Sequence, residues 1–139
     1  MSYKIVGKYI KDLNFCIPSP KAFFLLSKNI SNYKINIDIK SNQVKQNFIE
    51  VLTSLSLTPV EENFEKINTK IVFATLIELS NDKMEKHEIE KMVLVEVPTK
   101  VYSELRSIFV NLFESSGFKD IKISNSVDFQ KLYDLKRTQ

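Results

Sequence analysis

The spacing of apolar residues changes once along this 139-residue chain, and that change limits the folds open to it. Up to Leu79, apolar and polar residues alternate in several runs, as they do in a β-strand that buries one face. Beyond Leu79, apolar residues recur at the spacing of an amphipathic helix. Strands that come first and helices that come last predict an α+β fold.

Several runs alternate strongly enough to predict strands. Lys70–Leu79 carries apolar residues on both faces, which is typical of a central strand or of one that uses a face for association. The connections are short and polar, and they favour antiparallel pairing because a parallel return needs a longer crossover. The apolar patch Phe23–Leu26 neither alternates nor has the length of a typical helix, so no regular element is predicted there. The predicted strands are Tyr9–Phe15, Lys34–Lys40, Phe48–Leu57 and Lys70–Leu79.

The rest of the chain predicts two helices that pack on one face of this four-stranded antiparallel sheet. Asp82 followed by Glu85 resembles a capping box, so the first helix is expected to begin near Lys83. Pro98 is expected to kink that helix because proline lacks an N–H group, and Gly117 stands where the helix is expected to end. A shorter C-terminal helix is predicted over residues 127–136.

Length and composition predict a single domain over residues 1–139 that is soluble and cytoplasmic. No apolar run approaches the ~20 residues of a membrane span. Lysines interrupt the N-terminal segment, so no signal peptide is predicted. The single cysteine, Cys16, excludes an intrachain disulfide and fits a reducing compartment. The net charge of +3 rests on scattered lysines and only two arginines, a distribution that disfavours nucleic-acid binding.

The residue types needed for catalysis do not gather into a recognisable site. His87 is the one histidine, and its charged neighbours are typical of a solvated surface. Glu61, Glu62 and Glu65 are typical of a solvated turn rather than of a cation site. The two glycines of the chain cannot form a phosphate-binding loop. We expect a binding protein without cofactor or metal, rather than an enzyme or a small-ligand domain, which would need convergent polar residues around a cavity.

Three stretches resemble the SecB family of protein-export chaperones. Tyr9–Pro18 is similar to the family's first strand, and Phe48–Val51 is similar to an aromatic-x-Glu-Val strand start. Val97–Tyr133 is similar to the family's long helix with a proline, its Gly-Phe turn and its Val-x-Phe-x-x-Leu final helix. The resemblance implies an ATP-independent chaperone that binds unfolded or precursor polypeptides in hydrophobic grooves for export, and that assembles as a dimer or a tetramer.

The resemblance also implies where a client polypeptide binds. Two apolar segments, one after the first strand and one between the helices, are expected to border a groove, with Phe129 behind them. The residues alone leave a second interpretation open, in which these side chains complete the core beneath loops. Exchange of Phe24 and Phe118 for serine is predicted to weaken client binding while the fold persists. The candidate client-binding residues are Phe23, Phe24, Leu26, Tyr33, Phe118, Ile121 and Phe129.

In the SecB family, acidic residues on the exposed sheet face dock the motor ATPase SecA, and this chain departs from that pattern. Asp12 keeps one acidic position, but Cys16 replaces a glutamate and Lys70 stands where another acid is expected. A docking surface built on negative charge gains little from one carboxylate beside a lysine. An alternative therefore stays open, namely a dedicated chaperone for a single partner, such as an antitoxin, without coupling to SecA.

Overall fold

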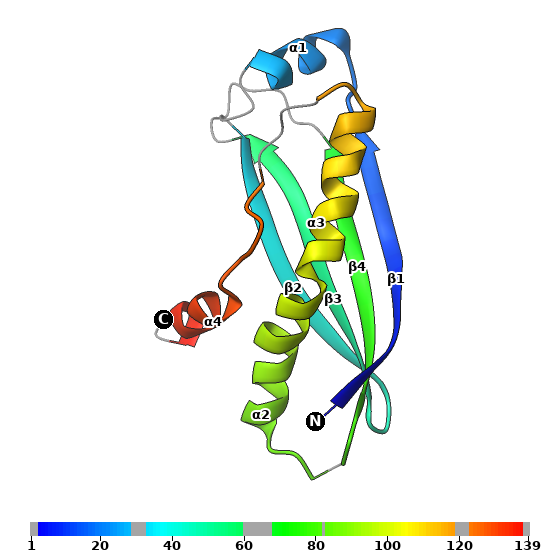
Figure 1. Cartoon of the computed structure of the whole chain (residues 1–139), viewed down its shortest axis with the longest axis vertical. Coiled ribbons are helices and arrows are strands. Elements are labelled where there is room, and N and C mark those ends of the chain that lie inside the picture. The colour runs from blue at the N-terminus through cyan, green and yellow to red at the C-terminus, as the bar shows by residue number, and fades with distance from the viewer. Residues whose placement is uncertain (1–2, 29–32, 60–67, 82, 119–122, 138–139) are drawn as a thin grey trace.

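The computed structural model describes residues 3–28, 33–59, 68–81, 83–118 and 123–137. Its elements are β1 (Tyr3–Cys16), α1 (Pro20–Lys28), β2 (Tyr33–Lys45), β3 (Phe48–Pro59), β4 (Asn68–Leu79), α2 (Lys86–Lys91), the π-helical turn η2 (Met92–Glu96), α3 (Val97–Ser115) and α4 (Phe129–Arg137). The antiparallel sheet has the strand order β1-β4-β3-β2, and helices pack on one of its faces (Figure 1). This arrangement confirms the predicted α+β fold and the central position predicted for β4.

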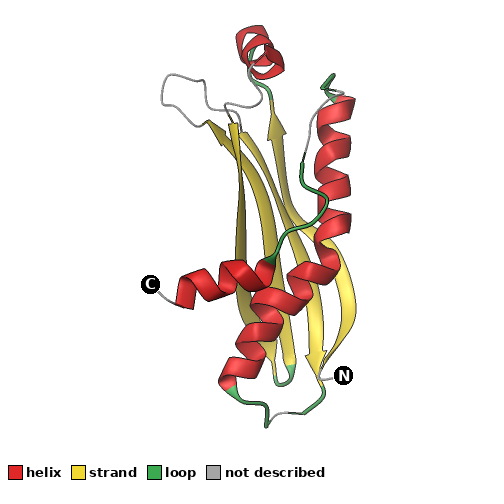
Figure 2. Cartoon of the chain, turned by 60° about the vertical axis from the view of Figure 1, so that its left-hand side comes forward, coloured by secondary structure: helices red, strands yellow, loops and turns green. Residues whose placement is uncertain are grey.

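The core lies between the sheet and the helical run α2–η2–α3, which crosses one face of the sheet (Figure 2). Leu55 of β3 and Ile71 of β4 point toward this run and are almost fully buried. Leu105, Phe109 and Phe113 of α3 recur every four residues and are fully buried against them. Full burial of one such side chain contributes about 1.5–3 kcal/mol. The seam between the sheet and α3 therefore contributes substantially to the stability of the fold.

Helix α1 is an element that the sequence prediction missed. Ser19 caps it, since its Oγ accepts a hydrogen bond from the backbone N–H of Ala22 at 3.1 Å. Pro20 occupies the first helical position, where its missing N–H costs nothing. Ala22 and Leu26 lie four residues apart on one helix face, and both are fully buried. The patch is helical because it anchors to the core, although it is only nine residues long.

The start of the long helical run differs from the prediction. Helix α2 begins at Lys86 with Glu85 as the N-cap, three residues later than expected, and no side chain caps it. Asp82, the predicted partner in a capping box, lies outside the described residues. The Asn81 side chain instead accepts a hydrogen bond from the Lys83 N–H at 2.8 Å, which makes a local turn before the helix.

Pro98 is accommodated by a change of hydrogen-bond register. The turn η2 is π-helical, and the Val97 N–H donates to the carbonyl of Met92, five residues back. Two residues later the Thr99 hydroxyl donates to the carbonyl of Val95 at 2.6 Å. Wider turns of this kind let a helix continue past a residue that cannot donate. The predicted kink is therefore a π-helical turn just before the proline, and α2, η2 and α3 form one continuous run (Figure 1).

Helix α3 ends at Ser115, just before the predicted Gly117. Gly117 has a φ of 98°, a conformation that favours glycine, and the Phe118 N–H donates to the Phe113 carbonyl at 2.9 Å. The described part of the following connection, which starts at Ile123, lies along α3, where the Tyr102 hydroxyl donates to the Ser124 carbonyl at 2.8 Å. The Arg106 Nε donates to the Ile123 carbonyl at 3.1 Å. These two bonds hold the connection against α3 and set the position of α4.

Candidate functional site

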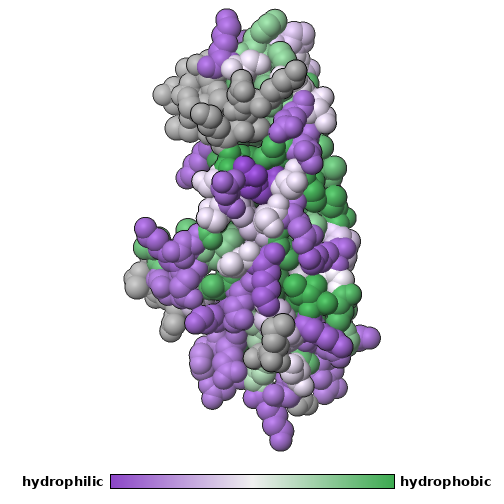
Figure 3. All heavy atoms as spheres, in the orientation of Figure 1, coloured by the Kyte–Doolittle hydropathy of each residue, from purple (hydrophilic) through white to green (hydrophobic). Residues whose placement is uncertain are grey.

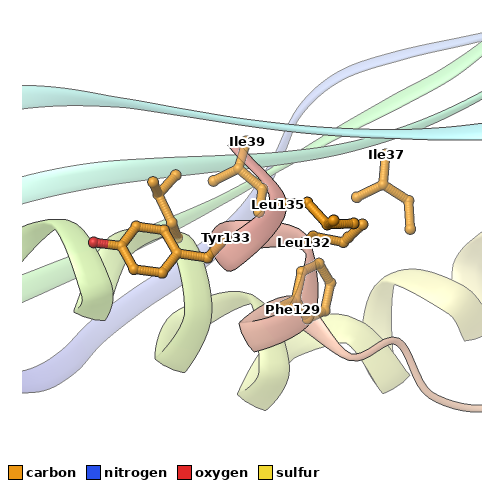
Figure 4. A pocket seen from close by; sticks show the side chains of 7 residues that line it. Ile37, Ile39, Phe129, Leu132, Tyr133 and Leu135 are labelled. Carbon is orange, nitrogen blue, oxygen red and sulfur yellow. The ribbon is translucent and has the colours of Figure 1, made fainter. Parts of the chain in front are cut away.

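An apolar groove separates α4 from β2 on the helix-bearing side of the sheet. Its volume is about 190 Å³. Figure 4 shows the side chains of β2 and α4 pointing toward one another across it. The groove is lined by Ile37, Ile39, Leu94, Phe129, Leu132, Tyr133 and Leu135.

One face of helix α4 is buried against the rest of the fold, and the adjacent face stays exposed beside β2. Phe129 and Tyr133 lie four residues apart and are 1% and 6% exposed, and the Phe129 ring packs edge-on against Tyr102 with centroids 6.0 Å apart. The Asp128 carboxylate caps the helix by accepting from the Lys131 N–H at 3.0 Å. Leu132 and Leu135 lie on the adjacent face and remain 42% and 52% exposed. They form an uncovered apolar wall.

The strand on the other side of the groove, β2, is an edge strand, since only β3 pairs with it in the described sheet. The Ser54 hydroxyl of β3 donates to the Asp38 carbonyl at 3.3 Å. This bond shows that the backbone groups of Asp38 point toward β3. Backbone direction alternates along an antiparallel strand. The N–H and C=O groups of Ile35, Ile37 and Ile39 therefore point to the open edge, while their side chains point to the helical side.

A second apolar region lies at the far end of the molecule, where α1 meets the end of α3. The Phe23 and Phe118 ring centroids are 4.8 Å apart. Phe118 lies 5.9 Å from Phe113, and Phe113 in turn lies 4.9 Å from Phe15. A Cβ at Gly117 would lie 3.4 Å from the Phe23 ring without a clash, so it is the φ of 98° that favours glycine there. Phe118 is 7% exposed, whereas Phe24 is 60% exposed at the outer end of the cluster.

The structure brings some of the predicted client-binding residues together and separates others. Phe23, Phe24 and Phe118 form one cluster, whose neighbour Leu26 is fully buried beneath α1. Phe129 lines the groove beside α4. Helix α4 lies well away from α1, as Figures 1 and 2 show. The side chain of Tyr33 and all of Ile121 lie outside the described residues. The sequence interpretation missed the β2 wall and the exposed leucines of α4, although the alternation around Ile37 was a usable signal.

The helix-free face of the sheet carries a buried carboxylate that the sequence did not reveal. Glu50 of β3 is 7% exposed, and it accepts hydrogen bonds from Lys11 Nζ at 2.7 Å and from the Tyr9 hydroxyl, both on β1. The Lys11 and Tyr9 bonds hold the pKa of the Glu50 carboxyl below its usual value. The same contact raises the pKa of Tyr9. Since β4 lies between β1 and β3, this cluster ties three strands together.

The predicted docking positions also lie on β1 and β4. Asp12, Cys16 and Lys70 are all exposed. Asp12 pairs in register with Val72, whose side chain points away from the helices, so Asp12 lies on the helix-free face. Glu50, another acid of that face, is buried and engaged by Lys11. The described part of this face therefore presents little uncompensated negative charge.

Two further properties bear on function. Within the described ranges, no helix is long and apolar enough to cross a membrane. Glu85, His87 and Glu88 place potential metal-binding atoms within 4.8 Å of one another, but all three side chains are exposed. The His87 imidazole already pairs with Glu85 at 3.2 Å. Exposed groups of this kind are common on helix surfaces, and no buried contact orients them.

The chain matches known sequences along its whole length. A family model described as preprotein translocase subunit SecB matches residues 1–139. A protein-export protein SecB of Pelagibacter ubique is 37% identical over 132 residues, and the match covers 95% of this chain and 94% of that protein. Protein-export protein SecB 1 of Gluconobacter oxydans is 26% identical over 142 residues, with 95% of this chain and 80% of that protein covered.

A solved structure has the same fold. It is a SecB-like chaperone of Mycobacterium tuberculosis in complex with a ChAD peptide from the HigA1 antitoxin, and it superposes with a TM-score of 0.64. The superposition covers 91% of this chain and 88% of that one, at 12% sequence identity. At that identity the likeness shows the fold alone.

Proposed function

Because the chain belongs to the SecB family of protein-export chaperones, we propose that it holds non-native polypeptide segments in the groove between β2 and α4. One observation carries this proposal: an apolar groove adjoins the unpaired edge of β2. An extended segment placed there pairs its backbone with the edge and buries alternate side chains against the groove wall. Strand addition of this kind is a common way to bind extended peptides.

The energetics favour loose binding of many clients. Each backbone hydrogen bond gained contributes about 0.5–1.5 kcal/mol net, and ordering each bound residue costs about 1–2 kcal/mol. The surplus comes from apolar burial, at about 25 cal/mol per Å². One groove of about 190 Å³ admits only a few side chains, so it binds weakly by itself. Several linked contacts along one client give useful affinity without demanding one sequence.

We propose the aromatic cluster at α1 as a second contact for longer clients. Phe24 is 60% exposed, so it is accessible without rearrangement. Phe118 and Leu26 are buried, and they support Phe23 and α1 from beneath. In this proposal some of the predicted client-binding residues contact the client, and others complete the core beneath them. Phe24 contacts the client, and the buried residues hold the surface in place.

We also propose that the chain forms a homodimer through β1, and that two dimers can form a tetramer. Val6, Ile10 and Leu13 of this edge strand are 42–45% exposed. In Figure 3, hydrophobic residues gather along the side of the molecule where β1 lies. Apolar patches of this kind on soluble proteins mark association surfaces. Coupling to SecA through acidic residues is not part of the proposal, because Lys70 and the engaged Glu50 leave Asp12 without acidic support.

The test of the groove exchanges its two exposed leucines. Leu132→Ser combined with Leu135→Ser is expected to weaken binding of a permanently unfolded polypeptide, such as reduced and carboxymethylated α-lactalbumin, by about tenfold or more. Val44→Ser is the matched control, since Val44 is 58% exposed on the β2–β3 hairpin. Fluorescence anisotropy measures the affinity, and circular dichroism checks the fold. Equal affinity of the folded double variant and the control would reject the groove.

The same assay separates a general chaperone from a dedicated one. A general chaperone suppresses the aggregation of several unrelated unfolded proteins at stoichiometric ratios. A dedicated chaperone for one partner suppresses none of them, although its groove still binds that partner. The result decides between the two even while the partner is unidentified.

A further inference from the structure

We propose that the polar row along the open edge of β2 selects clients by charge and fixes their register. This inference rests on the proposed function, because it requires an extended segment beside β2. The row consists of the β2 side chains that point away from the helices, opposite to the isoleucines of the groove. Its members are Lys34, Asn36, Asp38 and Lys40.

Neither lysine of this row has an acid directly opposite it on the side where β2 is already paired. In register, Lys34 faces Thr58 and Lys40 faces Leu52. Lys40 lies 3.9 Å from Asp38, but these side chains are 74% and 55% exposed, so the pair contributes little. Lys34 makes no ion pair within the described residues. A strand added at the open edge supplies the missing neighbours, and acidic side chains complement both lysines.

The spacing of the charges distinguishes one register from the next. In an antiparallel addition, side chains directly opposite each other interact, unlike charges attractively and like charges repulsively. A slip of one residue moves the apolar side chains out of the groove. A slip of two residues moves the client's acids off the lysines. In one direction both acids then face asparagines, and in the other direction one of them faces Asp38. Asp38 thus penalises one of the two slips.

The preferred client follows from this pattern. Read along an antiparallel strand, it carries an acid opposite Lys40, a base opposite Asp38, a neutral polar residue opposite Asn36 and an acid opposite Lys34. Apolar residues between them face Ile35, Ile37 and Ile39. The segment Glu-Val-Lys-Val-Thr-Val-Glu meets all of these conditions. Exchange of its first acid and its base gives Lys-Val-Glu-Val-Thr-Val-Glu, which has the same composition and net charge but opposes like charges at Lys40 and Asp38.

The experiment compares these two segments, each placed in a dye-labelled peptide with flexible Gly-Ser flanks. The matched peptide is expected to bind about tenfold tighter by fluorescence anisotropy in low salt, and the difference shrinks at high salt. Lys40→Glu in the chaperone is expected to abolish the preference, because each peptide then faces one like and one unlike charge at positions 40 and 38. Lys40 is exposed, so the fold is expected to persist. Lys83→Glu makes the same charge change at an exposed position outside β2 and is expected to leave the preference unchanged.

Each other outcome overturns a defined part of the argument. If both peptides bind equally tightly, charge does not set the register, and the groove itself stands. If neither peptide binds at millimolar concentration, the strand-addition mechanism fails together with this inference. If Lys40→Glu changes the mass measured by light scattering instead of the peptide preference, a second copy occupies the edge and the inference is wrong.

Discussion

The two edge strands of the sheet are built differently. β1 has register irregularities between Ile5 and Gly7 and between Ile10 and Asp12. β2 keeps one register with β3 from Tyr33 to Gln43 and becomes irregular only at the hairpin. Bulges bend an edge and interrupt its row of unpaired backbone groups, whereas a regular edge remains a template for another strand. The comparison assigns side-chain association to β1 and backbone pairing to β2.

Charged contacts strengthen this difference. Lys11, at the second irregularity of β1, is engaged by Glu50, and Lys8 pairs with Glu104 of α3. These contacts fix β1 to β3 on one face and to the helices on the other. Lys34 on β2 has no such partner within the described part of the chain. The edge strand β1 is therefore fixed by contacts within the chain, whereas the charged side chains of β2 stay available to a bound segment.

The largest expected effect concerns the apolar surface of β1. Ile10→Lys combined with Leu13→Lys is expected to convert the proposed dimer completely to monomer, because two charges replace exposed apolar side chains at the contact. Light scattering at micromolar concentration measures the mass. Val44→Lys, at an apolar position on the β2–β3 hairpin that is 58% exposed, is the control. A monomeric wild-type chain, or an unchanged mass of the variant, would contradict the assignment of β1.

A proline scan of β2 tests the other edge. Ile37→Pro removes an N–H that points to the open edge, so client affinity is expected to fall about tenfold or more while the β2–β3 ladder persists. Asp38→Pro removes an N–H that points to β3, so it is expected to lower the free energy of unfolding by about 1–3 kcal/mol. Anisotropy and urea unfolding measure the two effects. Equal loss of stability in both variants would show that the backbone directions are assigned wrongly.

The buried carboxylate on the helix-free face gives a pH-dependent test. Glu50→Gln is expected to cost about 1–2 kcal/mol of unfolding free energy at pH 7, since it weakens charge-assisted bonds from Lys11 and Tyr9. The folded pKa of Glu50 lies below the unfolded value of about 4.3, so its contribution is complete above that pH. The contribution is lost as the pH falls through the lower, folded value.

Urea unfolding of wild type and variant at pH 7, 5 and 3 measures this difference. The two stabilities are expected to differ at pH 7 and pH 5 and to approach each other at pH 3. A difference that stays constant from pH 7 to pH 3 would show that the Glu50 carboxylate contributes by packing and not by its charge.

The smallest expected effect is at the ion pair between β1 and α3. Lys8→Gln is expected to change stability by at most about 0.5 kcal/mol, because the Lys8 and Glu104 side chains are 36% and 46% exposed. Urea unfolding in low and high salt measures the change, which salt should reduce further. A loss above about 1.5 kcal/mol would mean that this contact holds the edge more firmly than its exposure implies.

The sequence predicted the sheet well because its signal is local. Alternation in Lys34–Lys40 and the two-faced pattern of Lys70–Leu79 report directly which side chains are buried. Gly117 was equally informative, since its φ of 98° is a local requirement. Helix α1 was missed because its stability comes from burial of Ala22 and Leu26 against distant residues, although the Ser19–Pro20 pair was a usable cap signal.

The candidate site was only partly predictable, for a related reason. Leu132 and Leu135 read as ordinary helix residues, and only the path of the connection held by Tyr102 and Arg106 leaves them uncovered. Phe118 and Phe24 are both phenylalanines in irregular or short segments, yet one is buried and the other exposed. Exposure is decided by tertiary contacts that spacing does not encode. The assignment of all these residues to client binding remains a prediction.

The π-helical turn before Pro98 lets the helical run α2–η2–α3 pack against two separate hydrophobic clusters. Met92 and Val93 pack with Tyr3, Ile49 and their neighbours, whereas Leu105 and Phe109 pack with Leu55 and Ile71. The strands of the sheet twist along their length. The apolar face of an unbroken α-helix would therefore turn gradually away from the sheet. The additional residue in the π-helical turn rotates the apolar face of the helix back toward the sheet. Deletion of one residue from Met92–Glu96 should therefore rotate all of α2 away from the cluster around Tyr3 and Ile49, rather than leave only a local gap.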